Sequence, residues 1–288
     1  MPPPRLLAIA LRVAWAVLPF TVGSAAGDLL DGRSAAVRLA AAVVLWAGWA
    51  TTLVAVLVPH PVSLTAVRVA APAAMAVAVA AAVDGSVSAP GLLGGVVVVA
   101  LAFVADIGEL FVNGPAYPNE RRYPLRPPGP VLLGTVELAW ALAVGGPVVG
   151  VLLVAASRPV AGFAVLASAL PVSYVLLRAL HGLSRRWVVF VPAGLVLHDT
   201  LSLADPVLFQ RKMIEVLRPA PADTDSLDLT KNALGLALEL VLREKAPMVL
   251  AVPGRRGGEP GSSARLLFSP TRPGAVLREA LSRRIPVE

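Results

Sequence analysis

The sequence predicts a membrane α-helical bundle of about six transmembrane helices over residues 1–183, followed by a small cytoplasmic β-rich domain with a C-terminal helix over residues 184–288. Hydrophobic residues make up 57% of the chain, charged residues only 15%, and the mean hydropathy is +0.76, as in proteins that contact lipid. The composition changes after residue 183, because the 105 residues from Ser184 carry 15 of the 25 basic and 11 of the 18 acidic residues. No apolar run in that tail reaches bilayer length.

The clearest span is Leu39–Val58, twenty residues without a charge, which as a helix crosses a hydrocarbon core of roughly 30 Å. The first span, Val13–Gly27, extends backwards past Arg12. In the third span, Leu64–Val83, Arg68 is expected to snorkel towards the head groups. The remaining spans are expected at Val13–Gly27, Leu64–Val83, Gly91–Ala105 with a continuation past Asp106, Leu138–Ala156 and Pro159–Leu177.

The distribution of arginine predicts the orientation, because cytoplasmic loops retain basic residues. With six spans the two termini share one side. If that side is the cytoplasm, it receives nine of the arginines that flank the spans, against three outside. The nine are Arg5, Arg12, Arg68, Arg121, Arg122, Arg126, Arg178, Arg185 and Arg186, and the three are Arg33, Arg38 and Arg158. The sequence therefore favours a multi-pass protein of the cytoplasmic membrane with both termini inside.

The N-terminus leaves one alternative open. Arg5 and Arg12 precede an apolar run that ends in the small residues 23–26, which resembles a cleavable signal peptide. The apolar run is long, contains Pro19 and has no polar boundary before Asp28, which favours a retained helix. Either reading leaves the C-terminal domain in the cytoplasm.

Three carboxylates lie in the expected membrane spans, where they are costly and usually face protein or water. Asp106 and Glu109 are three residues apart and share a helix face. If the fourth span ends at Asn113 and the fifth begins at Pro130, then Asp106 and Glu137 each lie about 10 Å inside the cytoplasmic ends of neighbouring helices. These residues form a candidate ligand site or charge network.

The segment between these two spans, residues 113–130, contains six prolines and is expected to be a semi-rigid cytoplasmic loop. Its basic residues Arg121, Arg122 and Arg126 complete the candidate site. They could neutralise Glu120 and the three carboxylates, which is the structural interpretation. The alternative is a site for a polar ligand, a proton or an anionic lipid.

In the tail, residues 187–191 and 195–198 flank a Pro-Ala-Gly turn and predict a β-hairpin. A terminal amphipathic helix is expected over Val276–Arg284. Residues 236–242 suit a strand or a helix by residue type. The other expected strands are 207–209, 213–217, 227–229, 248–252 and 265–268.

About seven short strands and one C-terminal helix resemble the bacterial pleckstrin-homology-like (PH-like) fold, on segments Arg185–Leu197 and Leu266–Leu277. The resemblance covers only the last third of the chain. Membrane spans followed by such a domain look like a group of uncharacterised bacterial polytopic membrane proteins with a C-terminal PH-like domain. The resemblance implies an architecture and no activity.

The sequence contains no motif that names a reaction. Cysteine is absent, and His60, His181 and His198 lie in three different regions, so metal chemistry has little support and no cofactor is expected. The set His198, Asp199 and Ser202 lacks a nucleophile elbow. Of the 25 basic residues 22 are arginine, which reflects codon bias more than binding to nucleic acid.

We therefore expect a non-enzymatic scaffold or binding module whose partners are the lipid bilayer and either anionic head groups or a cytoplasmic protein. The alternative is a small transporter or lipid-handling protein that uses the carboxylates and the segment 113–130.

Overall fold

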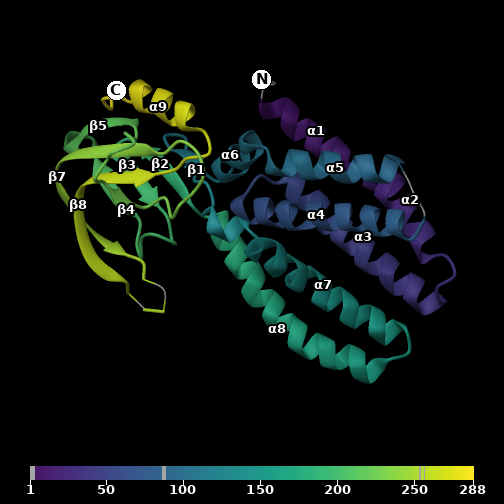
Figure 1. The fold of residues 1–288 in the computed structure, drawn as a ribbon. Coiled ribbons are helices and arrows are strands. Elements are labelled where there is room, and N and C mark those ends of the chain that lie inside the picture. Colours follow the sequence, from purple (N-terminus) through teal and green to yellow (C-terminus); the bar gives the residue numbers. More distant parts are fainter. Residues whose placement is uncertain (1–3, 86–88, 253, 256) are drawn as a thin grey trace. The chain divides into compact units, whose positions relative to one another are not determined.

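The computed structural model describes residues 4–85, 89–252, 254–255 and 257–288. The chain forms two compact units (Figure 1). The helical unit comprises residues 1–114 and 136–181, and the β unit comprises residues 115–135 and 182–288. The chain therefore passes between the two units three times.

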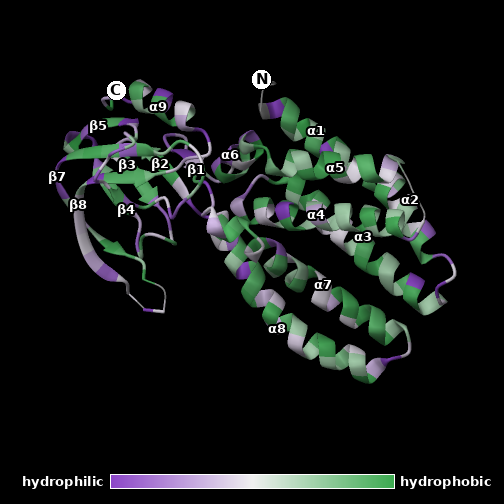
Figure 2. Ribbon diagram, in the orientation of Figure 1, coloured by the Kyte–Doolittle hydropathy of each residue, from purple (hydrophilic) through white to green (hydrophobic). Residues whose placement is uncertain are grey.

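The helical unit consists of long apolar helices, as Figure 2 shows by their colour. Five helices are long and apolar enough to cross a membrane, or six if a bent pair counts as one span, within the described ranges. The helices are α1 (Pro4–Ala16), α2 (Leu18–Leu30), α3 (Ala35–Leu57), α4 (Pro61–Val83), α5 (Ala89–Phe103), α6 (Ala105–Asn113), α7 (Thr135–Ala155) and α8 (Pro159–Leu183). Together α1 and α2 make the first span, Arg5–Leu30.

Side-chain hydrogen bonds join several of these helices. The indole nitrogens of Trp15 and Trp49 each donate to the other residue's carbonyl oxygen at 3.0 Å and connect α1 with α3. Trp140 of α7 donates to the Val69 carbonyl of α4 at 2.9 Å. His181 of α8 lies 2.8 Å from the hydroxyl of Thr65, also on α4. The polar atoms of these side chains are thereby satisfied inside an apolar unit.

Helices α7 and α8 approach each other closely at glycines. A Cβ atom added to Gly162 would lie 2.7 Å from the backbone nitrogen of Val154, and one on Gly150 would lie 2.7 Å from the Leu166 side chain. Small residues allow such close packing between membrane helices. Gly146 and Gly150 have the G-x-x-x-G spacing, and both lie against α8, at Ala169 and Leu166.

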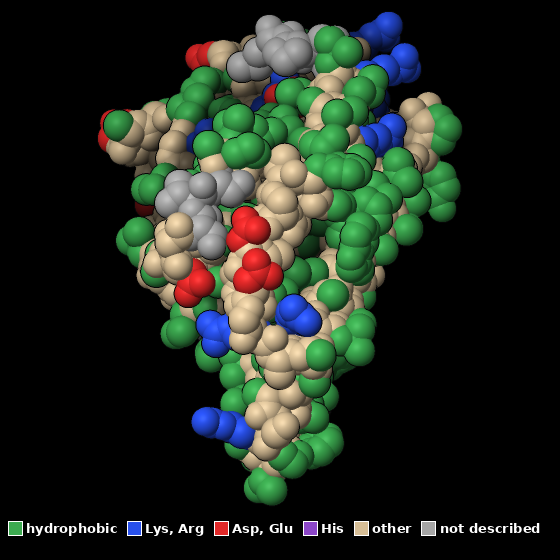
Figure 3. All heavy atoms as spheres, turned by 90° about the vertical axis from the view of Figure 1, so that its right-hand side faces the viewer, with side chains coloured by type: hydrophobic (Ala, Val, Ile, Leu, Met, Phe, Trp, Pro, Cys, Tyr) green, Lys and Arg blue, Asp and Glu red, His purple; other side chains and the backbone are tan. Residues whose placement is uncertain are grey.

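The loops α2–α3, α4–α5 and α7–α8 lie at the end of the helical unit that Figure 3 faces. Hydrophobic side chains cover most of this surface, and acidic and basic side chains are gathered at a few points. Exposed charged residues in or beside these loops include Asp28 in the last turn of α2, Asp31, Arg33, Asp84 and Arg158.

The β unit is a sandwich of two four-stranded sheets with one closing helix. The first sheet has the order β1-β2-β3-β4, and all its neighbours are antiparallel. The second has the order β5-β7-β8-β6, and β6 is parallel to β8. The elements are β1 (Arg121–Pro124), β2 (Trp187–Val191), β3 (Gly194–His198), β4 (Val207–Gln210), β5 (Ile214–Pro219), β6 (Leu227–Asp228), β7 (Leu238–Leu250), β8 (Glu259–Phe268) and α9 (Pro273–Ser282).

The core of the β unit lies between the sheets and follows the period of two that strands impose. Val188 and Phe190 of β2 are fully buried on the same face as Leu195 and Leu197 of β3. The second sheet contributes Leu238, Leu240 and Phe268, and α9 contributes Val276 and Ala280. Burial of this alternating apolar set is the main favourable term in folding the unit.

The structure corrects three predictions that were made from the sequence. The segment 113–130 is not only a loop, because Arg121–Pro124 forms β1 and pairs with β2, with Tyr123 opposite Val188. Residues 236–242 and 248–252 are not separate elements but belong mostly to the single long strand β7, which has an irregularity between Val241 and Ala246. The final helix begins at Pro273, three residues before its expected start.

Candidate functional site

The carboxylates Asp106 and Glu109 lie on α6, which is not a continuation of α5. The two helices are bent by 57° at a break, where Val104 has ψ 133°. The fourth expected span, Gly91–Ala105 with its continuation past Asp106, is therefore not one straight helix but a bent pair. Asp106 occupies the first turn of α6, where the helix dipole favours a negative charge, and Glu109 is buried with 5% of its surface exposed.

Arg68 of α4 contacts the other side of this break. Its Nε donates to the carbonyl oxygen of Ala102 at a long 3.4 Å, and its guanidinium lies 5.6 Å from the ring centre of Phe103, the last residue of α5. Carbonyls in the last turn of a helix have no partner within the helix. A cation therefore lies at the end of α5 and an anion at the start of α6, each of the sign that the dipole favours.

Glu137 lies closer to its helix end than expected. Helix α7 begins at Thr135, and a short 3-10 helix over Pro130–Leu132 precedes it, so Glu137 is in the first turn. At a rise of about 1.5 Å per residue its depth is about 3 Å rather than about 10 Å. Asp106 and Glu137 therefore do not lie at equal distances from the ends of their helices, as the sequence predicted.

The three arginines of the candidate site belong to the β unit. Arg122 forms an ion pair with Glu120 at 3.0 Å and lies over the ring of Trp187 at 5.6 Å. Arg121 lies 5.9 Å from the ring centre of Tyr123. Arg126 donates to the carbonyl oxygen of Leu234 at 2.9 Å. The carboxylates of the candidate site belong to the helical unit.

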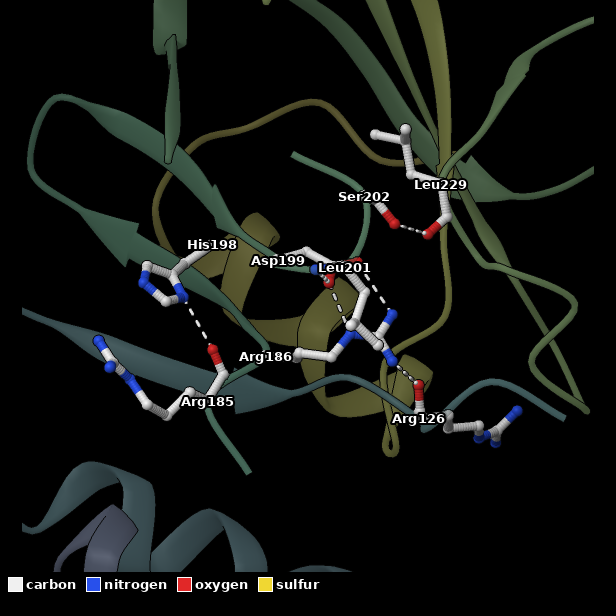
Figure 4. Close-up of polar contacts among 8 residues, drawn as sticks. All are labelled: Arg126, Arg185, Arg186, His198, Asp199, Leu201, Ser202 and Leu229. Atoms are coloured by element: carbon white, nitrogen blue, oxygen red, sulfur yellow. Dashed lines mark hydrogen bonds and ion pairs between the residues drawn. The ribbon is translucent and has the colours of Figure 1, made fainter. Parts of the chain in front are cut away.

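The β unit contains a buried ion pair that the sequence analysis did not predict (Figure 4). Arg186 binds Asp199 with two parallel hydrogen bonds, Nε to Oδ1 at 2.6 Å and Nη2 to Oδ2 at 2.9 Å. Both side chains are only 1% exposed. Nη1 of Arg186 also donates to the carbonyl oxygen of Arg126 at 2.8 Å. The pair therefore fastens the segment after β1 to the β2–β3 hairpin.

A period of two could have revealed this pair. Arg186 has the same phase as Val188 and Phe190, and Asp199 the same phase as Leu195 and Leu197, so both charges point towards the core. The arginine count instead places Arg186 with Arg185 among the residues that flank the last span.

Backbone contacts hold the same segment to the second sheet. The amide of Arg126 donates to the carbonyl of Ser269 at 2.8 Å, and the amide of Thr271 donates to Pro124 at 2.9 Å. The amide of Gly129 donates to Asn232 at 3.1 Å. Gly235 has φ +98°, and a side chain there would collide with Arg126. Residues 121–129 are thus an integral part of the β sandwich.

The set His198, Asp199 and Ser202 does not form a catalytic triad. Asp199 is bound to Arg186, and the hydroxyl of Ser202 donates to the carbonyl oxygen of Leu229 at 2.9 Å. His198 stacks on Trp187, with ring centres 5.0 Å apart, and its Nδ1 lies 2.8 Å from the carbonyl oxygen of Arg185. Burial lowers the pKa of His198, so the ring is neutral near pH 7.

A second buried carboxylate of the β unit, Glu239, lies near the start of β7, an inner strand of the second sheet, with no exposed side-chain surface. It accepts hydrogen bonds from Thr224 and Ser226 at 2.5 Å and from Arg218 at 2.8 Å. Burial raises the pKa of Glu239, but these donors outweigh it and lower the pKa to about 2. Arg218 also binds Glu288, so this network holds the C-terminal residues against β5.

These contacts define a helical unit of spanning length joined three times to a β sandwich whose buried charges are paired internally. No group of three His, Asp or Glu side chains within the described ranges could hold a metal ion. Comparison with protein-family models, with curated proteins and with solved structures found no match to this chain.

Proposed function

We propose that this chain is a non-enzymatic integral protein of the cytoplasmic membrane, whose β unit is a PH-like module that binds a cytoplasmic protein or the membrane surface. The observation that carries the proposal is the incorporation of residues 121–129 into the β sandwich. The chain passes three times between the units, so three connections attach the module to the helical unit. Such an attachment suits a scaffold.

The internal pairing of charges supports the same function. The buried charged side chains Arg186, Asp199 and Glu239 of the β unit are all bound to neighbouring groups. Charges that are satisfied in this way stabilise and position structure, whereas catalytic groups are usually held ready for a substrate. The two four-stranded sheets and the closing helix α9 support the PH-like assignment.

Cysteine accessibility tests the orientation on which the function depends. The chain has no cysteine, so a single introduced thiol can be observed without background. We expect Asp84→Cys, at the end of α4, to react with an impermeant maleimide in intact cells, and Lys245→Cys, on the exposed part of β7, to react only after permeabilisation. Labelling of Lys245→Cys in intact cells would contradict a cytoplasmic β unit.

A transporter or lipid-handling protein is the second candidate, and the break between α5 and α6 favours it. Discontinuous helices with charged residues at their ends form the substrate sites of many transporters. The two proposals differ in whether water reaches the break. A transporter predicts that Val104→Cys reacts with a small charged thiol reagent added outside, whereas a scaffold predicts no reaction. Asp84→Cys is the positive control in the same preparation.

A further inference from the structure

Arg68 carries a full charge within a helix that is long and apolar enough to cross a membrane. It follows Pro61, the first residue of α4, by seven positions, which corresponds to about 10 Å along the helix axis. A cation at such a depth is costly unless an anion or water compensates it, so intramembrane arginines usually mark a functional contact. The question is therefore what balances this charge.

Contacts within the protein compensate the charge and the N–H donors of Arg68 only in part. Of the five N–H donors of its guanidinium, the one on Nε is bonded, to the carbonyl of Ala102. Within the described part of the chain, no carboxylate forms an ion pair with Arg68 and neither Nη nitrogen has a hydrogen-bond partner. Arg68 is partly rather than fully buried, so part of its side chain reaches the molecular surface.

The surroundings indicate the kind of anion that completes the site. Arginine side chains in helices point back towards the N-terminus, which for α4 is the nearer membrane interface. Phe103, whose ring lies beside the guanidinium, is 53% exposed and offers an apolar surface next to the charge. A forked cationic donor beside an apolar surface matches a phosphate group that carries acyl chains.

We propose that Arg68 binds the phosphate group of an anionic phospholipid in the cytoplasmic leaflet, with an acyl chain against Phe103. This inference rests on the proposed membrane insertion. The arginine then has two functions: Nε holds the end of α5 at the break, and the Nη nitrogens bind the lipid. Occupancy of the site by lipid is thereby coupled to the geometry of α5 and α6.

The test compares lipid binding to the purified full chain by native mass spectrometry, with phosphatidylglycerol, phosphatidylcholine and inorganic phosphate as probes. We expect phosphatidylglycerol to bind the wild type most tightly and Arg68→Gln to weaken it about tenfold, the loss expected for one charged hydrogen-bond pair. The matched control is Arg38→Gln, an exposed arginine in the first turn of α3, which should bind like the wild type. Arg68→Lys keeps the charge without the fork and should bind with intermediate affinity.

Unchanged binding of phosphatidylglycerol to both Arg68 variants would overturn the proposal. Equal binding of phosphatidylcholine, or displacement by millimolar inorganic phosphate, would overturn the assignment to an anionic lipid. If Arg68→Gln fails to fold, Arg68→Lys alone decides between these outcomes. Resistance to alkaline carbonate extraction separately tests the proposed function: a chain that stays in the membrane but shows no Arg68-dependent binding refutes only the lipid site.

Discussion

Substitution of Asp199 should be the most damaging single change of a polar residue in the β unit. Asp199→Ala leaves the guanidinium of Arg186 buried with 1% exposure and without its two bonds of 2.6 and 2.9 Å. Removal of one partner from a buried pair costs about 3–5 kcal/mol, because the remaining charge is uncompensated. That is a large part of the roughly 5–15 kcal/mol that stabilises a typical domain.

A double variant separates the effect of a stranded charge from the value of the pair itself. In Arg186→Met with Asp199→Leu neither charge of the pair remains. The main loss is the donor to the carbonyl of Arg126, because the amide that loses its Asp199 acceptor belongs to the exposed residue Leu201, which water can reach. We expect a cost of about 1–3 kcal/mol, the usual penalty of one buried unsatisfied group. The double variant should therefore be more stable than Asp199→Ala alone.

Hydrogen–deuterium exchange of the full chain measures both variants on peptides from β2 and β3. Amide exchange in Asp199→Ala should accelerate about 100- to 4,000-fold, since 1.4 kcal/mol corresponds to tenfold. Glu259→Ala, which breaks the exposed pair with Arg255, is the matched control and should change exchange by less than about fivefold. An acceleration below tenfold in Asp199→Ala, or a double variant less stable than the single one, would refute the reasoning.

Three further predictions follow from the same contacts. Residues 184–288 alone lack β1, and their free energy of unfolding in denaturant should be about 2–5 kcal/mol lower than that of residues 115–131 joined to 182–288 by a glycine linker. Both proteins should give a β-dominated circular dichroism spectrum. The β unit should lose about 3 kcal/mol as the pH falls from 4.5 through about 2, because the folded pKa of Glu239 lies below its ordinary value, and Glu239→Gln should abolish this pH dependence in acid titrations of stability. Gly162→Ala should lower the melting temperature through a clash that costs about 1–3 kcal/mol, whereas Gly145→Ala, with nothing within 4 Å of the added Cβ, should not.

Local patterns predicted the helices of the membrane half well and the break in α5–α6 poorly. An uncharged run such as Leu39–Val58 specifies a span by its length and composition alone. The break at Val104 has no proline or glycine at the bend itself, and the residues on both sides are apolar. Arg68 contacts the break at Ala102, 34 residues later in the sequence, and local periodicity cannot register such a contact.

The same limit explains why the candidate site was predicted only in part. The residue types Asp106, Glu109 and Glu137 stood out because they are rare in spans, but the position of Glu137 depended on a helix start that the proline-rich segment obscured. The assignment of β1 required pairing with a strand more than 60 residues later. By contrast, the inward direction of Arg186 followed from the alternation of its own strand and was available from the sequence.

The order of the strands in the chain also determines when each strand can pair during synthesis. β1 leaves the ribosome before α7 and α8, yet its partner β2 follows about 60 residues later, which at 5–20 residues per second is roughly 3–12 s. During that interval Tyr123 and Leu125 have no core to enter, and the backbone of β1 has no partner strand. The prolines and arginines in and around β1 protect the unpaired strand during this interval, because both discourage pairing with strands of other chains. Synthesis of the α7–α8 hairpin must therefore precede closure of the first sheet.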